Sequence, residues 1–101
     1  GLHIGGVGLI QGDPSRPGRR APEDQLGRVA SIAADELDLL VLHQGPPGDS
    51  DQPGIPQLEA LIQRFGVPLT VCGHVHWERP LFRFPLGQVL NVHERGVILT
   101  R

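Results

Sequence analysis

The sequence predicts an α/β fold in which parallel strands alternate with helices. Two short apolar runs, residues 39–43 and 67–72, have the length and composition of buried strands. Residues 56–65 lie between them and carry apolar side chains on one helical face. A strand, a helix and a second strand form parallel neighbours with a right-handed connection. Both strand runs lead directly into segments that contain histidine.

Length and composition restrict the class of protein. The 101 residues suffice for one small domain, and 39% hydrophobic with 20% charged residues is ordinary for a globular chain. The formal net charge of -2 gives no reason to expect a nucleic acid or a membrane as partner. No apolar run approaches the ~18 residues of a membrane-spanning helix, and no signal sequence is recognisable, so we expect a cytoplasmic protein. The one cysteine cannot form an internal disulfide.

The first part of the chain predicts a strand, a loop and a helix. Residues 2–10 are apolar and rich in glycine, but their glycine spacing does not match a dinucleotide-binding motif. Residues 11–22 form a loop by composition. The arginines of this loop either help to hold an anionic substrate or are simply solvated; they are Arg16, Arg19 and Arg20.

Residues 23–37 predict the clearest helix. Apolar residues recur there at spacings of three and four, and Pro22 suits the first helical turn. Gly27 lies within this helix, where glycine is unfavourable, and therefore indicates close packing at that point.

The second part of the chain predicts a bent loop and a group of short strands. Residues 44–56 are rich in proline and glycine, and Asp49 and Asp51 in this loop either support a site at His43 or are turn residues. Cys72 is expected to be a small core residue rather than a nucleophile. Residues 81–84, 89–92 and 97–100 predict an antiparallel meander at the edge of the sheet.

Three histidines are candidate metal ligands: His43, His74 and His76. The carboxyl ends of parallel strands meet at one edge of a sheet, so we expect these histidines to lie close together. Imidazole is the commonest neutral side-chain ligand of Zn, Mn and Fe. His74 and His76 either project to the same side of an extended backbone or turn around Gly73 toward two different ions.

At this point the sequence resembles a known family. The hydrophobic strand that ends at His43, a Pro/Gly-rich loop, a helix, a strand and Gly73-His74-Val75-His76 resemble the C-terminal half of the calcineurin-like metallophosphoesterases. The strand around Asn91 is similar to the closing strands of that family. The resemblance implies that residues 1–101 are the C-terminal portion of a single metallophosphoesterase domain, part of an αββα sandwich.

The same resemblance implies a dinuclear metal centre. His43 and His74 would ligate one divalent ion and His76 the other, the ions being Mn, Fe or Zn. Such a centre hydrolyses phosphomonoesters or phosphodiesters. His74 and His76 would also act as catalytic residues by stabilising charge on the phosphoryl oxygens.

The sequence departs from this family in one respect. The early motifs D-x-H, G-D-x-x-D and G-N-H-[DE] do not occur. We therefore expect a C-terminal fragment that needs the missing N-terminal half of the same domain and hydrolyses little alone. A half-sheet would also expose apolar surface and tend to pair with itself.

Two alternatives to a phosphoesterase remain open at the level of sequence. The first is a noncatalytic module in which the three histidines bind one structural or regulatory Zn, with water as a fourth ligand. The second is a metal-free interaction domain in which the histidines are merely polar residues at strand ends.

Overall fold

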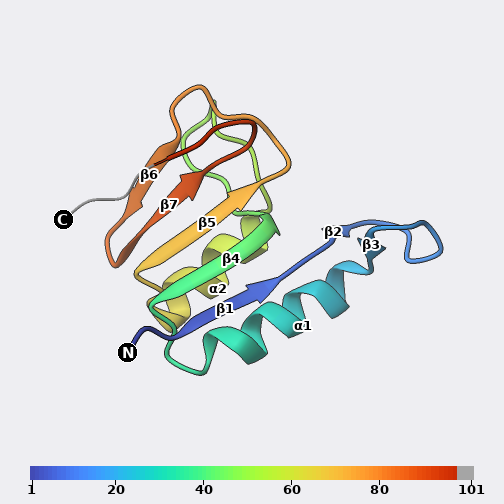
Figure 1. The fold of residues 1–101 in the computed structure, drawn as a ribbon. Coiled ribbons are helices and arrows are strands. Elements are labelled where there is room, and N and C mark those ends of the chain that lie inside the picture. Colours follow the sequence, from blue (N-terminus) through green and yellow to red (C-terminus); the bar gives the residue numbers. More distant parts are fainter. Residues whose placement is uncertain (98–101) are drawn as a thin grey trace.

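The main sheet has five strands in the order β1-β4-β5-β7-β6. The computed structural model describes residues 1–97 and is shown in Figure 1. The strands of the sheet are β1 (Ile4–Val7), β4 (Leu39–Gln44), β5 (Leu69–Gly73), β7 (Gly87–Asn91) and β6 (Leu81–Phe84). Strands β1, β4, β5 and β7 run parallel to one another, and β6 is antiparallel to β7. The predicted alternation of parallel strands and helices is therefore present.

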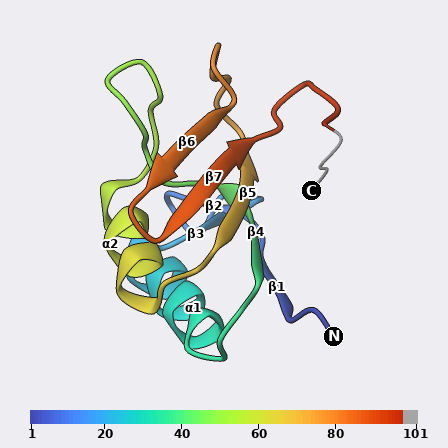
Figure 2. The same ribbon diagram turned by 90° about the vertical axis from the view of Figure 1, so that its left-hand side faces the viewer.

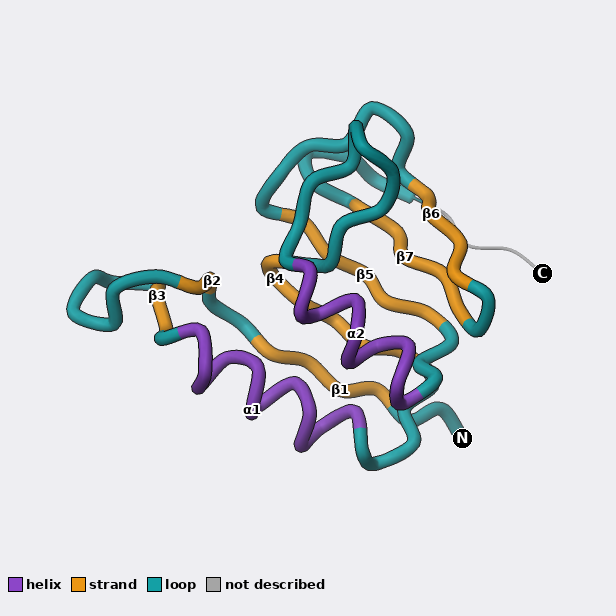
Figure 3. Tube along the Cα trace, turned by 180° about the vertical axis from the view of Figure 1, so that it is seen from behind, coloured by secondary structure: helices purple, strands orange, loops and turns teal. Residues whose placement is uncertain are grey.

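Both helices cover the same face of the sheet, as Figures 2 and 3 show from two sides. They are α1 (Pro22–Ala33) and α2 (Pro56–Phe65). One row of residues across the sheet faces these helices, and its members Leu40, Thr70 and Val89 have no exposed surface. The row continues to Gly5, where a Cβ atom would collide with the Ile32 side chain. Helix α1 and Leu37 therefore pack closely on β1, and a larger residue at position 5 would force the Ile32 and Leu37 side chains to move.

The opposite face of the sheet has no helix from residues 1–97 upon it. The neighbouring row of residues, which includes Val41 and Val71, points toward this face because successive strand residues alternate. Val41 is 42% exposed, and Ile4 on the edge strand is 60% exposed. A sheet with one covered face leaves apolar surface of this kind in contact with water.

Helix α1 is shorter than the periodicity predicts, because it ends at Ala33 rather than at residue 37. Leu37 is nevertheless buried. The turn after Ala34, in which Glu36 has a left-handed φ of 56°, carries Leu37 back into the core. The prediction of close packing at Gly27 is wrong, since this residue is exposed and nothing lies within 4 Å of a Cβ placed on it.

Helix α2 agrees with its sequence pattern. Leu58 and Ile62 are buried, and Gly66 ends the helix in the left-handed conformation with φ 63°. The strand that follows begins at Leu69 and not at residue 67, although Val67 is buried.

The last strands form an antiparallel pair rather than a simple meander. Strand β7 lies inside the sheet, parallel to β5, and β6 becomes the edge. Of the strand expected at residues 97–100, only Val97 is among the described residues, and it is not in a strand.

The loop predicted at residues 11–22 contains a small parallel pair of strands. Strand β2 (Ile10–Gln11) pairs with β3 (Arg19–Arg20), beyond the end of β1 in Figure 1. Two-residue strands have no periodicity and escape a reading of hydrophobic pattern. Among residues 1–97, no helix is long and apolar enough to cross a membrane.

Candidate functional site

A cavity of about 510 Å³ opens where the parallel strands end. The chain reaches this edge at His43 in β4, at His74 after β5 and at His93 after β7. All three histidines line the cavity, together with backbone and apolar side chains of β1, β4 and β5. Parallel strands place their carboxyl ends at one edge, so residues far apart in sequence meet here.

Within this edge the histidines form two pairs. The ring centroids of His43 and His74 are 5.3 Å apart, and those of His76 and His93 are 6.4 Å apart. Among residues 1–97, no three His, Cys, Asp or Glu side chains form a group that would hold a metal ion. The expected trio of His43, His74 and His76 is therefore not assembled as one cluster.

His76 has neighbours of its own. One guanidinium nitrogen of Arg95 lies 3.2 Å from both ring nitrogens of His76 and also donates to the Trp77 carbonyl. The Glu78 carboxylate lies 3.6 Å from Nε2 of His76. The His76 side chain is 46% exposed, so these contacts leave part of the ring open to solvent.

His74 has an unusual backbone conformation. Its φ is 71°, in the left-handed region that residues with a side chain rarely adopt. The sequence suggests Gly73 for the tight exit from the strand, but the structure puts the left-handed residue one position later. Outliers of this kind concentrate at functional sites, where the surrounding structure maintains the strain.

This conformation predicts that two substitutions at His74 differ in their effect on stability. We expect His74→Gly to be more stable than His74→Ala by about 1 kcal/mol, because glycine adopts positive φ without a Cβ penalty. Urea denaturation of the two variants gives the difference. Equal stability of the two variants would show that His74 is not held in the left-handed region in solution.

Asn91 connects the two segments that carry His74, His76 and His93. The side chain is 1% exposed, and its Nδ2 donates to the Val75 carbonyl at 2.7 Å. Its Oδ1 accepts a hydrogen bond from the His93 backbone N–H at 3.0 Å. Because Val75 is the residue between His74 and His76, one buried amide fixes the middle of this segment against the end of β7.

His93 is a site residue that sequence reasoning missed. The signal was present, since the largely apolar run at residues 89–92 leads into His93 just as residues 39–42 lead into His43. Assigning these residues to an antiparallel meander removed the reason to expect His93 at the same edge. The parallel pairing of β7 with β5 brings it there.

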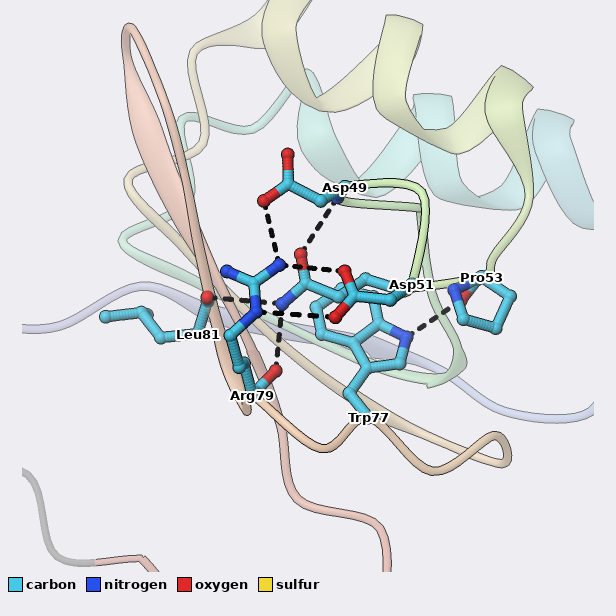
Figure 4. A network of polar contacts seen from close by, with 7 residues as sticks. Asp49, Asp51, Pro53, Trp77, Arg79 and Leu81 are labelled. Atoms are coloured by element: carbon cyan, nitrogen blue, oxygen red, sulfur yellow. Dashed lines mark hydrogen bonds and ion pairs between the residues drawn. The ribbon is translucent and has the colours of Figure 1, made fainter.

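The loop after β4 is fastened to the segment after His76, as Figure 4 shows. The Gln52 side chain is completely buried. Its Oε1 accepts a hydrogen bond from the Asp49 backbone N–H at 2.8 Å, and its Nε2 donates to the Arg79 carbonyl at 2.8 Å. The indole N–H of Trp77 donates to the Pro53 carbonyl at 2.9 Å. The loop that follows His43 is thereby held against the chain that follows His76.

Asp49 and Asp51, which were candidates to support His43, pair with Arg79 instead. One Arg79 nitrogen lies 2.9 Å from the Asp49 carboxylate and 2.8 Å from that of Asp51. The hydrogen bond from Arg79 lowers the pKa of Asp51 below its ordinary value. Both carboxylates therefore help to hold the loop after β4 against the segment that follows His76.

The lowered pKa predicts a loss of stability in acid. The Asp51–Arg79 pair stabilises the fold fully above the ordinary Asp pKa of about 3.9, and this contribution disappears as the pH falls through the lowered pKa. We expect Asp51→Asn to be slightly less stable than the wild type at pH 7, and this difference to shrink as the pH falls through the lowered pKa of Asp51. Urea midpoints at pH 7 and at successively lower pH values test this, and a constant difference would contradict the role of the ion pair.

Cys72 borders the cavity of about 510 Å³ but is itself buried, with 3% of its surface exposed. Burial raises the pKa of its thiol to about 12. The thiol therefore remains protonated at neutral pH, in agreement with its expected place in the core, and does not present a thiolate to a metal or a substrate.

No model of a known protein family matches this chain, and neither do curated proteins or solved structures. The functional assignment therefore depends on the chemistry of the residues at the strand ends.

Proposed function

We propose that this chain is the C-terminal part of a metal-dependent phosphoesterase domain that hydrolyses phosphomonoesters or phosphodiesters. The observation that carries the proposal is the His43–His74 pair, with ring centroids 5.3 Å apart at the ends of two adjacent parallel strands. Two imidazoles at this separation suit neighbouring positions around one divalent ion. The left-handed backbone at His74 supports a functional reason for its orientation.

His76 would hold a second ion from the same short segment once the Arg95 guanidinium, 3.2 Å from both ring nitrogens, has moved away. The bond from Asn91 to the Val75 carbonyl holds the backbone between His74 and His76. Two bound divalent ions would supply Lewis-acid chemistry toward a phosphate ester and a water of lowered pKa. The imidazoles of His43, His74 and His76 would hold the ions, and His43 and His74 also line the cavity. Mn, Fe and Zn all accept such ligands.

Carboxylates are the ligands that this half of the site lacks. Asp49 and Asp51 are paired with Arg79, and no acidic side chain lines the cavity among the described residues. We infer that the bridging carboxylate and the remaining ligands come from residues encoded before Gly1, which would also cover the open face of the sheet. The single three-histidine Zn site has less support, because the histidines are arranged as two pairs.

The first test is metal binding by the 101-residue chain. We expect Co²⁺ or Zn²⁺ to bind the wild type, and His43→Ala and His74→Ala to weaken the affinity at least tenfold, because each removes one of few ligands. His3→Ala is the matched control, since His3 lies before β1 at the other end of the sheet. Calorimetry or the visible Co²⁺ spectrum gives the affinities.

The second test is hydrolysis of p-nitrophenyl phosphate and its bis-ester with added Mn²⁺. The 101-residue chain is compared with a longer form that includes the preceding residues. We expect activity in the longer form alone, and its loss in His43→Ala and His74→Ala. Inactivity of both forms, with metal still bound, would favour a noncatalytic metal-binding module. Absence of metal binding would contradict the proposal at its first step.

A further inference from the structure

A second cavity, of about 370 Å³, adjoins the His43–His74 pair on the side of β2 and β3. Its walls are formed by two apolar side chains, a glycine, one cation and the two histidines: Leu9, Ile10, Gly18, Arg19, His43 and His74. Arg19 is the cationic side chain in this wall. The small two-stranded sheet thus places Arg19 in the same cavity wall as His43 and His74.

We propose that Arg19 is the anion-binding residue of the site and contacts the phosphoryl oxygens of a phosphate ester held beside His43 and His74. This inference rests on the proposed function and assigns a substrate contact to the loop that precedes α1. A guanidinium matches the geometry of phosphate oxygens and remains charged at any physiological pH.

The position of Arg19 is fixed by its own backbone. Arg19 pairs with Ile10 in the parallel register of β2 and β3. Flanking hydrogen bonds join the Ile10 N–H to the Gly18 carbonyl at 3.1 Å and the Gly12 N–H to the Arg20 carbonyl at 3.0 Å. The arginine stem also lies over Gly12, where a Cβ would come within 2.9 Å of Arg19 Cδ. Because its backbone and stem are held, Arg19 loses less entropy when it binds an anion.

The start of this loop is anchored to helix α1 by a buried amide. Gln25 is 1% exposed, and its Nε2 donates to the carbonyls of Gly8 and Leu9 at 3.2 and 3.3 Å. Leu9 itself has a left-handed φ of 68°, which is rare for leucine. The turn that leads into β2 therefore has a strained backbone, which the Gln25 side chain holds in place. Strained residues of this kind are common at binding sites.

The charge of Arg19 is not neutralised within the described residues. Arg20 and Arg28 pair with Asp24, and Arg79 pairs with two aspartates. Arg19 instead donates to the Pro17 carbonyl at 3.2 Å and has no carboxylate partner in residues 1–97. A neutral acceptor leaves the positive charge available to an anionic ligand.

The test measures binding of inorganic phosphate to the Co²⁺-loaded 101-residue chain by ³¹P NMR relaxation. We expect Arg19→Gln to weaken phosphate affinity about tenfold to a hundredfold, and Arg19→Lys to fall between this variant and the wild type. Arg16→Gln is the matched control, because Arg16 is in the same loop but does not line the cavity. It should change the affinity less than about threefold.

The outcomes separate this inference from the proposed function. If Co²⁺ binds through His43 and His74 but Arg19→Gln binds phosphate as tightly as the wild type, the anion-binding role of Arg19 is wrong and the metal site stands. Failure of the Co²⁺-loaded chain to bind phosphate at all has the same meaning. Failure to bind Co²⁺ overturns the proposed function, and the role of Arg19 falls with it.

Discussion

Replacement of Trp77 by alanine is expected to lower the free energy of unfolding by about 3–5 kcal/mol, the usual cost of removing a large core aromatic side chain. Trp77 is the largest of the fully buried side chains and is 1% exposed. It also follows His76 directly and donates its indole N–H to Pro53. The substitution therefore removes core packing together with the hydrogen bond that joins Trp77 to the loop after β4. Far-UV circular dichroism during urea denaturation measures the change, because the only tryptophan is lost.

Trp77→Phe separates packing from hydrogen bonding. It retains most of the aromatic volume but leaves the Pro53 carbonyl without its indole donor, so we expect a loss of about 1–2 kcal/mol. A loss of less than 1 kcal/mol in Trp77→Ala would contradict the closed packing around this residue. In that case the segment after His76 would be held by Gln52 and Arg79 alone.

Asn91→Leu is expected to destabilise the chain by about 3 kcal/mol and to disturb the metal site. Leucine has similar volume but leaves the Val75 carbonyl and the His93 N–H unpaired, and each buried unpaired group costs about 1–3 kcal/mol. We also expect the Co²⁺ affinity to fall, because the segment from His74 to His76 loses the bond at its middle residue. Urea denaturation and Co²⁺ titration measure the two effects.

Two companion variants make the Asn91 prediction specific. Asn91→Asp keeps an acceptor for the His93 N–H but places a carboxylate against the Val75 carbonyl, so it should also be destabilised. Gln88→Leu changes an exposed amide on the same strand and should alter stability by less than about 0.5 kcal/mol. An unchanged Co²⁺ affinity in Asn91→Leu, at a protein concentration where the chain is folded, would show that Asn91 does not position the histidines.

The meeting of His43 and His74 at one edge of the sheet was predictable from the sequence, because it follows from the direction of the strands. Parallel strands that end at His43 and just before His74 must deliver both residues to one edge, and the sequence contains that information. The division into two pairs was not predictable. It depends on the left-handed backbone at His74 and on the Asn91 amide, whose partners are 2 and 16 residues away along the chain.

Other features of the structure could not be predicted from the sequence, because the residues that determine them lie far apart along the chain. Gln52 is in a Pro/Gly-rich loop that resembles solvated chain, yet it is fully buried through bonds to carbonyls 27 and 29 residues away. Helix α1 appeared too long because Leu37 continues the apolar period after the helix has ended. Local pattern records that a residue is buried, but not which element carries it into the core.

The contact between Gly45 and Cys72 allows the motion of the loop after His43 to be measured by chemical labelling of the thiol. Gly45 begins the loop after β4, and a Cβ placed on it would collide with the Cys72 sulfur. A thiol reagent therefore reaches this sulfur only in molecules whose loop has transiently lifted. The labelling rate, divided by the rate for the unfolded chain, equals the population of lifted molecules. Because the loop starts two residues after His43, that population is also the fraction of time during which one wall of the edge is open.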